Sequence, residues 1–517
     1  MKLLKKSIFT NYKHNIYSKA ILKPVSSKWN DLRRLTGTEN KVLTKNNVFT
    51  NFKFIEYPSS KSPFLVRAYE IDKELQKGNK KPFEEVIKGN VGDAIAMGQK
   101  PITFLRQVLA LAVLPELLEN PQYPEDAKER VRTILKNCNG GNVGSYSASP
   151  GIEIIRRHVA KYIENRDCFP SDYNNIILSN GTSDGIKSFL KLFNEPINGK
   201  PSGVMIPVPQ YPLYSAILEE YGLYQIGYYL NEENKWSLDI SELERAYQVS
   251  EKICRPRVLV VINPGNPTGQ VLSLENIQDI IKFAHKRRLF LLADEVYQTN
   301  IYGENSKFHS FKKVMNAMGE PYSEMELASF MSISKGYTGE CGLRGGYAEI
   351  VNMDSDVMSI FLKSLSAVLC PNILGQVAMD VVVNPPKPNE PSYSIFIKEK
   401  TEILNSLAEK SHLMTDTLNS IPGYKVNRAL GSIFVFPRID FPEKAIAAAK
   451  AVNQSPDLFY TFRLLEATGI CVLAGSWFGQ KPGTYHFRTT ILPQRERVTK
   501  MLSSLKEFHL KFLEKYS

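Results

Sequence analysis

The stretch FMSISKG (Phe330–Gly336) places a lysine directly after an apolar run that is typical of a buried strand. Burying an ammonium group is costly, so a lysine at the end of such a strand needs a partner or a depressed basicity. A lysine amine held in that state is the group that forms an imine with a carbonyl compound. The structural alternative is a strand-end lysine that extends its amine to solvent, so Lys335 gains weight only from other segments.

Around this stretch, short β-rich runs alternate with amphipathic helical segments. Several runs are apolar throughout, as expected for strands that are buried on both faces of a mostly parallel sheet. This alternation predicts an α/β domain built on a mostly parallel, seven-stranded central sheet. The expected strands are Asn175–Leu178, Val204–Pro207, Tyr224–Tyr229, Arg257–Ile262, Leu289–Ala293, Phe330–Ser334 and Gly346–Ile350.

Helical patterns precede this region, and a proline-rich connection follows it. The stretch NPPKPNEP (Asn384–Pro391) cannot continue a helix or a strand, so we interpret it as the entry to a C-terminal domain. The expected helices are Leu65–Lys77, a single long helix over Ile102–Leu118 that ends before Pro121, Glu125–Lys136 and Ile152–Glu164. The expected division is a basic extension (1–55), an arm with part of a small domain (56–120), a large domain (121–385) and an α+β small domain (386–517).

Three further polar segments begin where apolar runs end. NPGNPTG (Asn263–Gly269) would project polar groups into the crevice where doubly wound sheets bind ligands. ADEVY (Ala293–Tyr297) places an acid after four apolar residues, which is costly unless the acid meets a cation. NGTSDG (Asn180–Gly185) opens a helix with small residues and hydroxyls, a pattern that favours anion binding. Taken singly, these segments would be a surface turn, a helix cap and an N-cap.

Taken together and in this order, the four segments resemble those of the fold-type-I aminotransferases, which use pyridoxal 5′-phosphate (PLP). The resemblance runs from roughly Phe64 to the C-terminus. It implies the PLP-dependent transferase fold of type I, with a large PLP-binding domain and a smaller α+β domain.

The resemblance assigns cofactor roles to residues in these segments. It implies that Lys335 forms the internal aldimine with PLP and then moves the proton between the substrate Cα and C4′. It implies that Asp294 keeps the pyridinium nitrogen protonated and that Tyr211 stacks on the ring. Asn266 and Tyr297 would hydrogen-bond the phenolic oxygen.

The resemblance also implies a phosphate site, a substrate site and a dimer. The phosphate would be held by Thr182, Ser183, Ser332 and Arg344, and by Tyr146 of a neighbouring subunit, which implies an obligate homodimer with shared active sites. Arg488 matches the arginine that grips the substrate α-carboxylate, because a planar guanidinium fixes it with two parallel bonds. Gly92 would lie near the substrate side chain, and Asn266 would also bind the substrate. His486, close to Arg488, is interpreted as a packing residue rather than a base.

Within this family, longer segments resemble those of the alanine aminotransferases. They are Asn90–Gln99, Pro101–Gln107, Tyr146–Ser149, Gly339–Gly346 and Gly475–Gln480. The resemblance implies the reaction L-alanine + 2-oxoglutarate = pyruvate + L-glutamate, in a ping-pong route. The alternatives are another aminotransferase of this fold, of glyoxylate or kynurenine type, a carbon–sulfur lyase, an aminocyclopropane-carboxylate synthase, or a non-catalytic PLP-binding module.

The positive charge is concentrated at the N-terminus. The formal net charge is +12, yet residues 1–55 hold ten lysines and two arginines against only Asp31 and Glu39. The rest of the chain is therefore nearly neutral, which gives a nucleic-acid partner little support. A basic tail free of acids up to Asn30, with interspersed serines and apolar residues, predicts a mitochondrial transit segment, with the cytoplasm as the alternative.

Other function classes are not supported. The six cysteines are far apart and form no Cys-x-x-Cys motif, which is typical of a protein in a reducing compartment and of neither a zinc finger nor a disulfide framework. The seven histidines are scattered, so no metal site is expected. The longest apolar run, Val108–Leu118, is shorter than a membrane span requires and contains a proline, so no membrane partner is expected.

Overall fold

The computed structural model describes Asn51, Ile55, Tyr57 and residues 62–517. The chain divides into two units, Met1–Phe54 and Ile55–Ser517, and every element below belongs to the second unit. The predicted transit segment at residues 1–55 lies outside the described residues except for Asn51 and Ile55.

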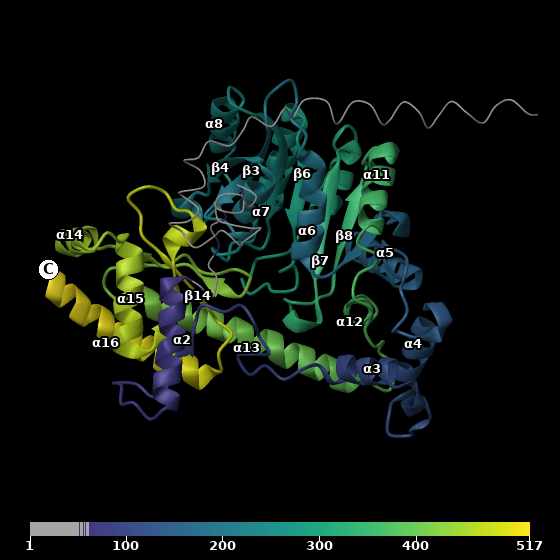
Figure 1. The fold of residues 1–517 in the computed structure, drawn as a ribbon, viewed down its shortest axis with the longest axis horizontal. Helices are drawn as coiled ribbons and strands as arrows, with labels where there is room; N and C mark the ends of the chain where they lie inside the picture. The colour runs from purple at the N-terminus through teal and green to yellow at the C-terminus, as the bar shows by residue number, and fades with distance from the viewer. Residues whose placement is uncertain (1–50, 52–54, 56, 58–61) are drawn as a thin grey trace, which may run out of the picture. The chain divides into compact units, whose positions relative to one another are not determined.

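A seven-stranded sheet forms the centre of this unit, in the order β2-β8-β7-β6-β5-β3-β4 (Figure 1). Strand β8 is antiparallel to both β2 and β7, and all other neighbouring strands are parallel. Each predicted run forms one strand, so the predicted α/β class with a mostly parallel sheet is confirmed. The strands are β2 (Ile176–Ser179), β3 (Ser202–Val208), β4 (Tyr224–Tyr229), β5 (Arg255–Ile262), β6 (Phe290–Asp294), β7 (Leu327–Ser332) and β8 (Gly346–Val351).

Both faces of the sheet are buried. In β5, Val258 and Val260 pack into a cluster with helices α6 (Thr182–Leu190) and α7 (Leu213–Tyr221). Leu259 between them points to the opposite cluster, with α8 (Ile240–Ser250), α9 (Leu274–Arg287) and α10 (Phe311–Met318). Because side chains alternate along a strand, burial of both faces requires the uninterrupted apolar runs that the sequence shows.

The carboxyl ends of the parallel strands bring the polar segments together. Ile262 at the end of β5 pairs with Asp294 at the end of β6, and Asp294 pairs with Phe330 of β7. The segments that follow these strands therefore lie side by side at one edge, where open α/β sheets bind ligands.

One predicted helix is wrong. The stretch Ile102–Leu118 is not a single helix: α3 (Thr103–Val113) ends, and a 3-10 helix, η2 (Pro115–Glu119), follows. Pro115 has no N–H to donate and disfavours helical angles at Leu114, which adopts φ −126° and ψ 82°. The other predicted helices form as α2 (Pro63–Gln76), α4 (Glu125–Lys136) and α5 (Glu153–Asp167).

The C-terminal part has three small sheets and its own apolar core. Figure 1 shows α14, α15 and α16 grouped on one side of the large sheet. Residues Asn384–Pro391 form neither helix nor strand, between α12 (Ile373–Val383) and α13 (Tyr393–Asn419). The strands are β9 (Tyr424–Lys425) paired with β11 (Arg438–Ile439), β14 (Phe487–Thr490) between β10 (Phe434–Val435) and β13 (Leu473–Ala474), and β1 (Ile87–Lys88) paired with β12 (Ile470–Cys471). The remaining helices are α14 (Glu443–Ala451), α15 (Pro456–Thr468) and α16 (Arg495–Tyr516).

Among the described residues, no helix combines the length and the apolar character that crossing a membrane requires.

Candidate active site

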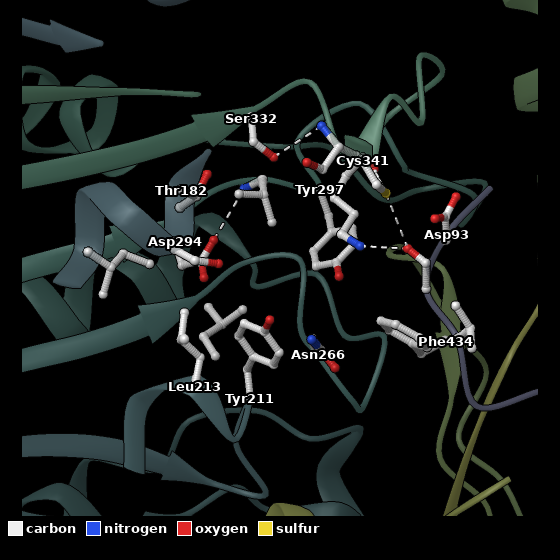
Figure 2. A pocket seen from close by; sticks show the side chains of 18 of the residues that line it. Asp93, Thr182, Tyr211, Leu213, Asn266, Asp294, Tyr297, Ser332, Cys341 and Phe434 are labelled. Atoms are coloured by element: carbon white, nitrogen blue, oxygen red, sulfur yellow. Dashed lines mark hydrogen bonds between the residues drawn. The ribbon is translucent and has the colours of Figure 1, made fainter. Parts of the chain in front are cut away.

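A cavity of about 320 Å³ lies where β5, β6 and β7 end (Figure 2). Every predicted site residue except Tyr146 lines it, although these residues come from segments up to about 400 positions apart. The lining residues that the sequence predicted are Gly92, Thr182, Ser183, Tyr211, Asn266, Asp294, Tyr297, Ser332, Lys335, Arg344 and Arg488.

The amine in the cavity belongs to Lys335, in the loop that follows β7. Its Nζ donates a hydrogen bond to the carbonyl oxygen of Gly92 at 2.8 Å. Burial lowers the pKa of Lys335 below its ordinary value, because desolvation disfavours the charged ammonium. The structure therefore gives this lysine the depressed basicity that imine chemistry requires.

Asp294 ends strand β6 and is fully enclosed. The hydroxyl of Tyr214 donates to its Oδ2 at 3.0 Å. Burial raises the pKa of Asp294 to about 6, and the hydrogen bond from Tyr214 partly offsets this rise. Because hydrogen bonds offset only part of the cost of burying this carboxylate, it attracts a cationic group that enters the cavity.

The N-terminus of α6 and the Arg344 guanidinium form an anion cradle. Gly181 caps the helix at φ 80°, and a side-chain carbon there would lie 2.5 Å from Nη2 of Arg344. The Oγ1 atom of Thr182 is buried without a hydrogen-bond partner, in the first turn of α6, where backbone N–H groups have no partner within the helix. An unpartnered hydroxyl, a cation and a helix N-terminus together suit a phosphate group.

Arg488 extends from β14 into the opposite side of the cavity. Its Nη1 donates to Oδ1 of Asn266 at 3.2 Å, and its Nη2 donates to the carbonyl oxygen of Asn90 at 2.9 Å. The guanidinium lies over the ring of Phe434, with its carbon 3.9 Å from the centroid. Burial lowers the pKa of Arg488 to about 10, and its Nε has no hydrogen-bond partner. This cation is short of anionic partners, as expected of a carboxylate-binding group.

The remaining predicted residues complete the walls of the cavity. Tyr211 and Asn266 lie on the same side in Figure 2, and Tyr297 also lines the cavity. Ser332 accepts a hydrogen bond from the Ser334 amide at 3.3 Å. At Gly92, a side-chain carbon would lie 2.9 Å from Cζ of Phe434 and 3.3 Å from Nζ of Lys335, so the absence of a side chain there keeps the space beside the amine open.

Tyr146 is the one predicted site residue outside the cavity. Its side chain is 67% exposed and lies on the surface of the described chain. An exposed tyrosine fits its expected role in a neighbouring subunit's site, but one chain does not test that role.

Several lining residues were not predicted. Tyr57 reaches the hydroxyl of Tyr211 at 3.4 Å, and Asp93, Cys341 and Phe434 also line the cavity. Asp93 and Cys341 fall inside the segments Asn90–Gln99 and Gly339–Gly346, which resemble those of the alanine aminotransferases, whereas Tyr57 and Phe434 carry no local signal. Tyr214, which donates a hydrogen bond to Asp294, lies in the first turn of α7, three residues after Tyr211, and carries no local signal of this contact.

The cavity fits PLP in each of its parts. The α6 cradle has an unpartnered hydroxyl for a phosphate, Asp294 is a buried acceptor for a ring N–H, and Lys335 is a buried amine of lowered pKa. All three face one enclosed space, so no rearrangement of the chain is needed to bring them to a single molecule.

Comparisons with known proteins identify the family. Residues 117–505 match the family aminotransferase class I and II. A Danio rerio protein named alanine aminotransferase 2-like is 54% identical over 93% of this chain and 87% of its own. A Dictyostelium discoideum protein named "Probable alanine aminotransferase, mitochondrial" is 44% identical over 93% of this chain and 91% of its own.

Solved structures show the same fold. An alanine aminotransferase from Pyrococcus furiosus superposes with a TM-score of 0.70 over 90% of this chain and 100% of its own, at 19% identity. The chain thus belongs to the class I and II aminotransferases, the PLP-dependent transaminases of fold type I.

Proposed function

We propose that this chain is an alanine aminotransferase, which converts L-alanine and 2-oxoglutarate to pyruvate and L-glutamate. The observation that carries the proposal is the single cavity that contains the Lys335 amine, the Asp294 carboxylate and the Arg488 guanidinium. The 54% identity to the Danio rerio protein supports the choice of alanine among amino acids.

Arg488 and Gly92 select the substrate in this proposal. Arg488 binds the α-carboxylate through its planar guanidinium, which fixes the orientation of the amino acid. Gly92 carries no side chain where one would touch Lys335 and Phe434, so a small substrate side chain fits beside the amine.

Lys335 and Asp294 have separate roles in this proposal: Lys335 moves a proton at the substrate Cα, and Asp294 holds a proton on the ring nitrogen. When bound, PLP accepts the electron pair that is released at the substrate Cα. Lys335 would take the proton from that Cα, because burial lowers its pKa and so favours the neutral amine that acts as a base. Asp294 would accept a hydrogen bond from the ring nitrogen and keep that nitrogen protonated. Tyr211 would pack on the ring, and Asn266 and Tyr297 would donate to its phenolic oxygen.

The phosphate is held by the cradle at α6. Thr182, Ser183 and Ser332 supply hydroxyl groups, and Arg344 supplies a positive charge. The Thr182 hydroxyl gains the partner that the protein itself does not provide.

We also propose a homodimer in which Tyr146 reaches the phosphate of the neighbouring subunit. In support, Ile360, Val368 and Leu369 expose apolar side chains on α11 (Ser355–Ser366) and just after it. The hydroxyls of Ser149 and Ser366 lie 3.3 Å apart, which places the Tyr146 segment beside this apolar surface. A second copy would cover both.

The compartment and the domain division remain parts of the proposal. The basic N-terminal composition and the name of the Dictyostelium discoideum relative support import into mitochondria, with the cytoplasm as the alternative. We propose a large PLP-binding domain over 121–385, with 56–120 and 386–517 contributing to a small domain. The pairing of β1 with β12 supports the last assignment.

The visible spectrum of the purified holoenzyme, before and after addition of L-alanine alone, tests this function. We expect the absorption of the bound cofactor to change, with about one pyruvate formed per Lys335 because the first half-reaction needs no 2-oxoglutarate. A spectrum that responds to another amino acid but not to alanine would keep the transaminase and refute the substrate. A protein that binds PLP but transfers no amino group would refute the function altogether.

A further inference from the structure

Beside the cavity, His486 lies in a buried cluster to which the proposed mechanism gives no role. It directly precedes β14 and stands two residues before Arg488, so both side chains project from the same face of an extended segment. The imidazole is 1% exposed and stacks on the ring of Phe436, with centroids 4.7 Å apart and planes 4° from parallel.

Both ring nitrogens of His486 face oxygen atoms. Nδ1 lies 3.0 Å from Oε1 of Gln480, and Nε2 lies 3.1 Å from Oε1 of Glu232. The orientation of the Gln480 amide is set by its other end, because Nε2 of Gln480 donates to Oδ2 of Asp457 at 3.2 Å. The oxygen of Gln480 therefore faces the histidine and accepts a proton from Nδ1.

The same reasoning places a proton on Nε2. A carboxylate only accepts hydrogen bonds, so the contact with Glu232 requires a proton on either Nε2 or the carboxyl group. Nη1 of Arg438 lies 3.7 Å from the second oxygen of Glu232, so the carboxylate forms an ion pair on its far side as well. A ring stacked on Phe436 also gains from carrying the positive charge. Both conditions put the proton on His486.

The cluster joins the two sides of the active site. Glu232 begins η6 (Glu232–Asn234), shortly after β4 of the large sheet, whereas His486 leads into the strand that carries Arg488. Gln480 follows η9 (Gly475–Phe478), whose Phe478 ring lies 4.7 Å from the guanidinium carbon of Arg488. The two bonds of His486 thus tie the Arg488 strand to the large sheet and to the segment that packs on Arg488.

We infer that His486 is a buried imidazolium that, through its ion pair with Glu232, positions Arg488 for binding the substrate carboxylate. The inference rests on the proposed role of Arg488. The groups that face the ring are Glu232 from η6, Gln480 from the loop after η9, and Phe436 and Trp236 as aromatic neighbours, with Arg438 behind Glu232. A cavity of about 600 Å³, lined in part by Glu232 and Arg438, adjoins the pair and gives solvent protons access to it.

The substitution Glu232→Gln tests the charge without removing the hydrogen bond. A glutamine amide donates to a neutral Nε2, so the ring stays bonded while the ion pair is lost. In the holoenzyme we expect the KM for alanine to rise about ten-fold, with kcat within about two-fold of wild type, because binding geometry changes while the reacting groups do not.

The matched control is Glu233→Gln, the neighbouring glutamate, whose side chain is 86% exposed and contacts Arg438 at 3.3 Å. It should leave the KM for alanine unchanged.

A second measurement reads the proton directly. In holoenzyme labelled with ¹⁵N-histidine, the signals that disappear in His486→Asn belong to His486. Both ring nitrogens should be protonated in the wild type at neutral pH, and only one in Glu232→Gln. An unprotonated ring nitrogen in the wild type, or a KM within two-fold of wild type in Glu232→Gln, overturns the inference. If alanine itself is not a substrate, the proposed function fails, whereas the proton measurement still decides the state of His486.

Discussion

At the scale of single residues, the site depends on three ionisable groups whose pKa values are shifted from the ordinary ones by burial. Lys335 has its pKa lowered, Asp294 has its pKa raised to about 6, and Arg488 has its pKa lowered to about 10. Desolvation is the largest cause in all three, and no ion pair within 4 Å compensates any of them in the described chain. A ligand that brings a carboxylate, a ring nitrogen and a carbonyl carbon satisfies all three at once.

Replacement of Lys335 by alanine should abolish turnover while leaving the fold intact. We expect kcat to fall by at least about 10³-fold, because neither an imine-forming amine nor a base at the substrate Cα remains. The apoprotein should unfold at the same temperature as wild type or higher, since a buried amine is removed. Coupled assay of pyruvate formation and thermal unfolding measure the two effects, and a variant that keeps a tenth of its kcat would contradict the role.

At the scale of elements, the ends of strands and the start of one helix supply most of the chemistry. Strands β5, β6 and β7 are mostly apolar towards their carboxyl ends, and polar segments begin at or just after their last residues. Local sequence was sufficient to predict these positions because the change from apolar to polar marks the end of each strand. The apolar periodicity of Ile102–Leu118 continues across Pro115, so the periodicity alone predicts a longer helix than the one that forms.

The start of α6 offers a test of the phosphate cradle. Thr182→Val removes a buried hydroxyl that has no partner in the protein. The Kd for PLP should rise about ten-fold, because a hydrogen bond to a charged group contributes about 1.5–3 kcal/mol. The apoprotein should be no less stable. Thr299→Val, at another buried hydroxyl without a partner but outside the cavity, is the control and should leave the Kd for PLP unchanged.

The turn after β6 predicts a pH dependence of stability. Burial raises the pKa of Glu295 to about 8, although its Oε1 accepts a hydrogen bond from the Phe311 amide at 2.9 Å. A raised pKa means that the folded state binds the proton more tightly, so this contribution is complete below about pH 4.5 and is lost as pH rises through about 8.

Glu295→Gln stays neutral and should escape that loss. Between pH 6 and pH 9, we expect its free energy of unfolding to fall by about 2–3 kcal/mol less than that of wild type. Denaturant unfolding at both pH values measures the difference, with the exposed Glu116→Gln as the control that should follow wild type. Parallel pH profiles for Glu295→Gln and wild type would show that Glu295 of the wild type is ionised in both the folded and the unfolded state, which would contradict the prediction.

At the scale of the whole molecule, the proposed dimer makes each active site a joint product of two chains. Tyr146 is exposed in one chain, beside an apolar surface on and after α11 that has no cover. Sedimentation velocity should give a dimer mass. The arrangement also predicts complementation, because in a hybrid dimer the Lys335 defect of one chain and the Tyr146 defect of the other fall in the same site and leave the second site intact.

Co-expression of Lys335→Ala with Tyr146→Ala should therefore recover about a quarter of wild-type activity, as half of the dimers are hybrids with one intact site. Co-expression of Lys335→Ala with Asp294→Asn is the control: both defects lie in the chain's own cavity, so no hybrid has an intact site. Equal activity in the two mixtures would contradict shared sites.

The sequence by itself determined the α/β class and the order of the strands along the chain, because each depends on a local apolar run or on the polar segment at its end. The residues that line most of the cavity were assigned by the resemblance of such segments to those of the fold-type-I aminotransferases. Only the tertiary structure revealed that Tyr214 holds Asp294, that Phe434 and Phe478 enclose Arg488, and that Glu232 meets His486. Most of these pairs join residues far apart in the chain, and a side chain that packs or pairs across such a distance leaves no periodicity from which to predict its partner.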